Sequence, residues 1–196
     1  MTVAPQLTRR ILLQAAGLAA AQIVAGQANA MESTEKQMTV NYDGKPGEFD
    51  FLNGEWKIQH RRLKNPASKE WDIFEGEATC WSVLGGIASI EELRIPARNF
   101  SGMGVRLLDV KNKQWSDFWV NAASGVLNPP AVIGGFVHGD GIFISDELDG
   151  GAPIKIRGVW DKITQQSCRW QQAISRDNGK TWEDNWLMEW QRVNGS

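Results

Sequence analysis

The chain has 196 residues, with 21 Lys and Arg against 23 Asp and Glu, and a formal net charge of −2. This acidic balance argues against a general nucleic-acid binder, which normally carries a basic surface. Hydrophobic residues make up 42% of the chain, which is enough for a packed core and excludes a disordered protein. Outside the N-terminus no apolar run has membrane-spanning length, so we expect no stable membrane insertion of the mature protein.

The first thirty residues have the features of an export signal. They contain no acidic residue; Arg9 and Arg10 precede a moderately apolar stretch, and Ala28-Asn29-Ala30 is a small-residue cleavage site. This order is typical of a Tat-type signal peptide. An uncleaved membrane anchor is the alternative, but the apolar stretch is short for that purpose. The sequence therefore predicts cleavage after Ala30 and a periplasmic protein.

The remaining chain, 31–196, has the length of one domain. Residues 31–48 are polar and rich in turn formers, so we expect a leader that lies along the domain. Phe49-Asp50-Phe51-Leu52 has the composition of a short helical turn that closes one end of the domain 49–196. No later stretch has the sustained 3.6-residue apolar period of a helix.

The rest of the domain is a series of apolar runs separated by turn residues, which is typical of antiparallel strands. Many short strands in one domain predict an all-β sandwich or closed barrel with little helix. We expect ten strands, at about 55–64, 70–83, 87–95, 102–110, 114–121, 131–137, 140–147, 153–162, 166–175 and 183–193.

One turn carries a recognisable motif, Ser175-x-Asp177-x-Gly179-x-Thr181-Trp182, which resembles an Asp-box. In such a turn the Asp side chain bonds the backbone, Gly supplies a positive φ, and Trp packs under the hairpin. Asp-boxes occur in sialidase propellers, where they recur blade by blade. Because the motif occurs here once, we interpret it as a structural turn and not as evidence for a glycosidase.

The tripeptide Gly54-Glu55-Trp56 at the start of the first expected strand resembles the G-x-W signature of lipocalins, whose Trp plugs the closed end of the barrel. The segment as a whole resembles an uncharacterised bacterial family of lipocalin-like (calycin) barrels. The matching pieces are Phe49 to Trp56, His60-Arg61-Arg62-Leu63, Leu84-Gly85-Gly86, and Trp170 through the Asp-box to Met188. The resemblance implies a closed antiparallel barrel with an internal cavity. It supplies no activity and no catalytic residues.

The first strand suggests a polar site inside such a barrel. Side chains alternate between the faces of a strand, so an inward Trp56 places His60 and Arg62 on the inner face as well. A buried charge needs a partner, and the next strand offers Glu75. A His60–Arg62–Glu75 cluster is therefore the candidate catalytic site, and an interior polar network with no chemical role is its alternative.

The chain contains ten Trp, which is more than a core of this size needs. Some must be structural plugs, Trp56 and Trp182 among them, and the others are candidates for an aromatic ligand cavity. With one arginine added, the candidate ligand-binding residues are Trp71, Trp115, Trp119, Arg157, Trp170, Trp186 and Trp190.

The second histidine and the two cysteines do not indicate a particular reaction or metal. His138 lies in an expected hairpin turn, where it is either simply exposed or placed at the cavity mouth. Cys80 and Cys168 are equally compatible with a disulfide and with two buried thiols. The spacing of Cys and His has no zinc signature, so no metal site is predicted.

These observations lead to three hypotheses. The first is a periplasmic barrel, monomeric or weakly dimeric, that binds a small apolar or aromatic molecule, with Arg62 and His60 orienting a carboxylate, phenolate or carbonyl. The second is an isomerase, cyclase or lyase on the same barrel, with His60 as general acid or base, Glu75 orienting it and Arg62 stabilising an oxyanion. The third is a haem carrier with His60 as the iron ligand; no cofactor is predicted, and no flanking pattern supports haem.

Overall fold

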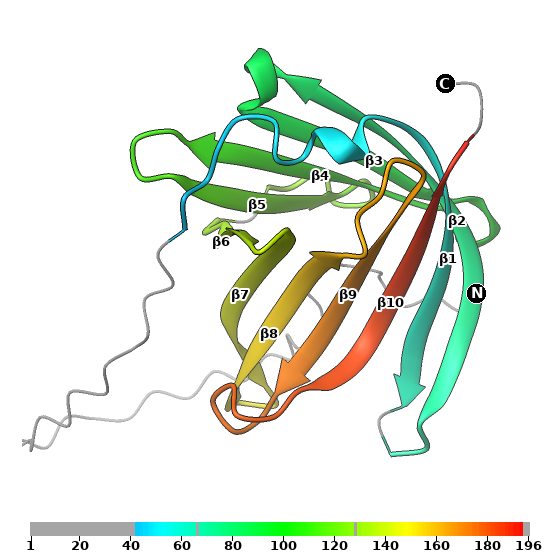
Figure 1. The fold of residues 1–196 in the computed structure, drawn as a ribbon. Helices are drawn as coiled ribbons and strands as arrows, with labels where there is room; N and C mark the ends of the chain where they lie inside the picture. Colours follow the sequence, from blue (N-terminus) through cyan, green and yellow to red (C-terminus); the bar gives the residue numbers. More distant parts are fainter. Residues whose placement is uncertain (1–41, 66, 128, 194–196) are drawn as a thin grey trace, which may run out of the picture.

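The computed structural model describes residues 42–65, 67–127 and 129–193, so the predicted export signal and most of the predicted leader lie outside the described residues. The described chain forms a closed antiparallel barrel of ten strands (Figure 1). The strands are β1 (Gly54–Asn65), β2 (Glu70–Val83), β3 (Ala88–Ile95), β4 (Phe100–Asp109), β5 (Gln114–Asn121), β6 (Val132–Val137), β7 (Asp140–Asp149), β8 (Ala152–Asp161), β9 (Ser167–Ser175) and β10 (Glu183–Arg192).

Each strand pairs with the next along the chain, and β10 closes the barrel by pairing with β1. The only helical elements among the described residues are the short 3-10 turns η1 (Asp50–Leu52), η2 (Leu84–Gly86) and η3 (Pro96–Arg98). None of the described helices is long and apolar enough to cross a membrane. The prediction of an all-β, ten-stranded barrel with a lipocalin-like architecture is confirmed.

The segment before β1 closes one end of the barrel. In Figure 1 it crosses that end, in blue to cyan, and includes η1. The backbone N–H of Gly44 donates to the Lys113 carbonyl oxygen at 2.9 Å, and that of Gly47 donates to the Gly86 carbonyl oxygen at 3.0 Å. These bonds anchor the segment to two hairpins, so Phe49 and Leu52 are buried inside the barrel.

Trp56 and Arg192 fix the closed end from the barrel side. The indole N–H of Trp56 donates to the Leu52 carbonyl oxygen at 2.6 Å. The Arg192 guanidinium lies 4.3 Å from the centroid of the Trp56 ring and donates to the Phe51 carbonyl oxygen at 2.8 Å and to the Asn53 carbonyl oxygen. The G-x-W Trp therefore plugs this end of the barrel, as its resemblance to lipocalins implied.

The Asp-box forms the β9–β10 hairpin turn at the other end. The Asp177 carboxylate accepts hydrogen bonds from the backbone N–H groups of Lys180 and Thr181 and from the Thr181 hydroxyl at 2.6 to 3.0 Å. Gly179 has a φ of +88°, and the Trp182 indole N–H donates to its carbonyl oxygen at 3.1 Å. Every polar group of the motif is used within the turn, which confirms its structural role.

Candidate ligand cavity

A cavity lies inside the barrel on the side formed by β5 to β9. The space between atoms there is about 550 Å³, a figure that includes open solvent, and the centre of a water-sized sphere can occupy about 60 Å³ of it. The apolar part of its wall includes Trp119, Phe143, Ile156 and Trp170. Its polar side chains are Asp117, Ser145, Glu147 and Gln172.

Strand alternation explains why these residues meet. Phe143, Ser145 and Glu147 occupy every second position of β7, and Trp170 and Gln172 do the same on β9. Gly102 on β4 makes room for the Trp119 ring, because a Cβ atom at position 102 would collide with the indole. The cavity wall therefore results from the alternation of side chains on five strands and from the space that Gly102 leaves for the Trp119 ring.

A buried ion network borders the cavity. Arg106 on β4 and Glu91 on β3 are both fully buried and form a salt bridge through Nη2 and Oε2. The Nε atom of Arg106 lies 3.7 Å from Oδ1 of Asp117, which lines the cavity. Although burial opposes it, the charges of Glu91 and Asp117 raise the pKa of Arg106, so its guanidinium stays charged.

His60 points inward, as predicted, but it is fully buried and does not line the cavity. Its imidazole stacks on Phe74 with ring centroids 4.6 Å apart. The indole N–H of Trp186 donates to its Nδ1 atom at 3.2 Å. His60 is thus part of the packed interior between two aromatic rings.

Arg62 lies beside His60 and does not line the cavity either. Its guanidinium lies 4.8 Å from the centroid of the Trp186 ring, and its backbone partner on β2 is Asp72. Asp72 in turn forms a salt bridge of 2.6 Å with Arg98. Burial, together with the neighbouring charge of Arg98, lowers the pKa of Arg62.

The expected partner of this pair, Glu75, lies on the other side of the sheet. It pairs with the exposed Gln59, whereas His60 pairs with Phe74. The inner face of β2 instead carries the buried residues Gly76, Ala78 and Cys80. The predicted cluster is therefore wrong in its carboxylate, because Glu75 lies on the same outer face of β2 as Trp71 and the exposed Ile73.

The predicted ligand-binding tryptophans fall into three groups. Trp119 and Trp170 line the cavity, and Trp186 touches Trp170 edge to face with ring centroids 5.8 Å apart. Trp115 and Trp190 belong to the core, where Trp115 packs on Phe49 at 4.9 Å and Trp190 packs on Trp160 at 5.3 Å. Trp71 lies on the outer face beneath Arg61.

Arg157 also lies outside the cavity lining. Its guanidinium is 4.4 Å from the centroid of the Trp182 ring in the Asp-box hairpin. It alternates with the inward residues Ile156 and Gly158 on β8, and so points to the outer face. Its place in the structure is to hold the hairpin against the barrel.

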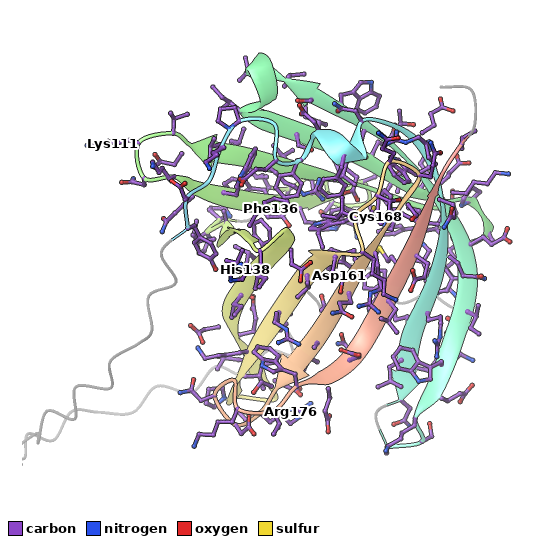
Figure 2. All side chains as sticks on the ribbon, in the orientation of Figure 1. Lys111, Phe136, His138, Asp161, Cys168 and Arg176 are labelled. Atoms are coloured by element: carbon purple, nitrogen blue, oxygen red, sulfur yellow. The ribbon has the colours of Figure 1, made fainter. Side chains whose placement is uncertain are left out.

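The second histidine is exposed in the β6–β7 turn. His138 has a φ of +54° there, and this turn lies at the closed end of the barrel. Figure 2 labels His138 at this turn and Arg176 at the β9–β10 hairpin. Of the two histidines in the chain, neither lines the cavity, so the side chains present do not fit an axial haem ligand there.

Cys80 and Cys168 are both buried, and neither forms a disulfide. Cys168, labelled in Figure 2, lies on β9. Burial is the largest cause that raises the pKa of its thiol. The two alternatives that the sequence left open are thereby resolved in favour of thiols.

Glu91, Arg106 and Glu147 were missed by the sequence reasoning. Each of them is separated by an even number of positions from an inward residue on its own strand, so the alternation of side chains places it on the inner face. The pairs are Glu91 and Leu93, Arg106 and Leu108, and Glu147 and Phe143.

Comparison with known proteins adds no assignment, since neither the family models nor the curated proteins that were searched contain a match to this chain.

Proposed function

We propose that the protein is an exported small-molecule-binding barrel of the lipocalin-like type, and that its ligand has an apolar or aromatic body. The observation that carries this proposal is the partly open cavity inside the barrel that is walled by Trp119, Phe143 and Trp170. Burial of apolar surface supplies about 25 cal/mol per Å² before the cost of ordering the ligand. Because the N-terminal segment closes one end of the barrel, the ligand enters from the end of the Asp-box hairpin.

The geometry favours binding over the two other hypotheses. An acid or base must come within hydrogen-bond reach of its substrate, and His60 is enclosed between Phe74 and Trp186. The same enclosure separates its ring from a ligand such as haem in the cavity. The binding hypothesis depends on neither histidine.

Native mass spectrometry of protein purified from its own periplasm tests the proposal. We expect a retained small-molecule adduct that disappears on denaturation. The same spectrum reports whether the protein is a monomer or a weak dimer, as we expect. A ligand that exchanges quickly is then sought by screening a library of small aromatic compounds by the same method.

A cavity-filling variant links the adduct to the cavity. Gly158 lines the cavity, and a Cβ atom there would lie 3.4 Å from the Trp170 indole nitrogen, which is an ordinary contact distance. Gly158→Leu should therefore fold and lose the adduct, whereas Ala152→Leu at the exposed start of β8 should keep it. An adduct retained by Gly158→Leu, or no binder from the library, would contradict the proposal.

Export is proposed on the strength of Arg9, Arg10 and the Ala28-Asn29-Ala30 site. The periplasmic form should have the mass of residues 31–196, and replacement of both arginines by lysine should hold the full-length chain in the cytoplasm. A full-length chain in the membrane fraction would favour the anchor instead.

A further inference from the structure

We propose that the ligand of this cavity is an organic cation, such as a protonated amine attached to an aromatic or apolar body. This inference rests on the proposed binding function and reverses the charge that the sequence suggested. Among the described residues that line the cavity there is no Lys, Arg or His, and the two ionisable side chains are Asp117 and Glu147.

Glu147 is the carboxylate available to a ligand. It lines the cavity at the end of β7, and its side chain has no salt bridge or hydrogen bond with any other residue that the structure describes. Its outward neighbour Asp146 takes the only nearby lysine on β8, since Lys155 Nζ lies 2.6 Å from Asp146 Oδ1. A carboxylate that remains charged in a partly buried site is stabilised by a cation.

Asp117 adds negative charge to the cavity wall. Its cationic neighbour Arg106 is shared with Glu91, which holds the shorter contact through Nη2. Glu91, Asp117 and Glu147 together carry three formal negative charges against the single positive charge of Arg106. The interior on this side of the barrel is therefore acidic overall, and an incoming anion would be repelled.

Gln172 gives an independent indication of the ligand's polarity. Its side chain lines the cavity and the residue is only 8% exposed. Its Nε2 atom donates to the Asn185 side-chain oxygen at 3.1 Å, and this bond does not use the amide oxygen. That oxygen accepts no hydrogen bond from the described residues, so it offers an acceptor to an N–H donor of the ligand.

The basic residues that could bind an anion are used elsewhere. Arg157 lies on the outer face over Trp182, Arg62 lies over Trp186, and Arg106 is enclosed by its ion pairs. The walls instead include Trp119 and Trp170, and indole rings attract cations. Carboxylates, an amide oxygen and indole rings together match an ammonium group with an aromatic body.

The test compares three probes of the same shape and different charge: tryptamine, tryptophol and indoleacetate. Isothermal titration calorimetry on the mature protein should give an affinity for tryptamine at least about tenfold above that for neutral tryptophol, because hydrogen bonds to charged groups are about twice as strong as neutral ones. Indoleacetate should bind least well, and added salt should weaken tryptamine binding.

Glu147→Gln should lower tryptamine affinity by about tenfold or more and leave tryptophol affinity within about twofold. Glu75→Gln is the matched control, because this carboxylate lies on the outer face of β2 and should change neither affinity. Circular dichroism of both variants verifies folding, and the preference of the unaltered protein among the probes is a second measurement that needs no variant.

The inference is overturned if tryptophol or indoleacetate binds as tightly as tryptamine, if tryptamine does not bind at millimolar concentration, or if Glu147→Gln leaves its affinity unchanged. Failure of the binding function itself has a different signature, since the library screen would then find no cavity ligand of any charge. A neutral or anionic ligand that Gly158→Leu displaces would retain the proposed function and reject only the cation.

Discussion

The imidazole of His60 lies directly over Gly76 of the neighbouring strand. A Cβ atom at position 76 would be 2.5 Å from Nε2 of His60 and 3.1 Å from the carbonyl oxygen of Arg94. The absence of a side chain at Gly76 thus makes room for the His60 ring, which stacks on Phe74 and is tilted by 40° to the Trp186 ring.

This close approach predicts that even a methyl group at position 76 destabilises the fold. Gly76→Ala should lower the free energy of unfolding by about 1–3 kcal/mol, because the His60 ring has no free space into which it can move. Urea denaturation measures the change. Gly158→Ala is the control, since its Cβ atom would meet only an ordinary contact of 3.4 Å; equal stability of the two variants would contradict the prediction.

The buried pair of Arg106 and Glu91 predicts a large effect of removing one partner. Arg106→Met should lower the free energy of unfolding by about 3–5 kcal/mol, because it leaves the Glu91 charge buried without its guanidinium. Adding Glu91→Gln to that variant should recover part of the loss.

Arg94 on the outer face provides the control for this experiment. It pairs with Glu77 at 2.9 Å in a partly exposed position, so Arg94→Met should cost no more than about 1 kcal/mol. Guanidinium denaturation compares the three variants, and an Arg106→Met cost as small as that of Arg94→Met would show that the buried pair is not needed.

The Asp-box predicts a pH dependence of stability. Hydrogen bonds from the Thr181 hydroxyl and backbone and from the Ser175 hydroxyl hold the pKa of Asp177 well below its ordinary value of 3.8. A carboxyl group whose pKa is lower in the folded than in the unfolded state stabilises the fold at pH values above its unfolded-state pKa. That contribution is lost as the pH falls below about 4.

Thermal unfolding between pH 7 and pH 3 measures this contribution. Asp177→Asn should show a smaller loss of melting temperature on acidification than the unaltered protein. Asp140→Asn is the comparison, since the Asp140 side chain has no hydrogen bond within the described part of the chain and its variant should keep the original profile. Identical profiles for all three proteins would reject the role of Asp177.

The two thiols should be inert in the folded protein. Both are buried, and burial raises the pKa of Cys168, so little thiolate is available for alkylation. Iodoacetamide should label neither cysteine under native conditions and both in urea, as measured by mass spectrometry. Rapid labelling of the native protein, or a denatured mass that is lower by two hydrogen atoms, would contradict two buried thiols outside a disulfide.

The sequence by itself determined the ten strands, the η1 turn and the Asp-box hairpin, because each depends on residues close together in the chain. The predicted strand limits agree with the observed ones within two residues. The inward direction of β1 also followed from alternation after Trp56.

Only the tertiary structure decided which side chains meet inside the barrel. The face of β2 depends on its register against β1, where Ile58 pairs with Gly76, and this register places Glu75 on the outer face. Alternation within each strand places Glu91 and Arg106 on the inner face, but only the pairing of β3, β4 and β5 brings them together with Asp117.

The same limit applies to the cavity. Trp115 and Trp119 share one face of β5, but Trp115 packs against Phe49 of the N-terminal segment, whereas Trp119 lines the open space. Their sequence context is alike, and the difference arises because the N-terminal segment fills one end of the barrel and leaves the other unfilled.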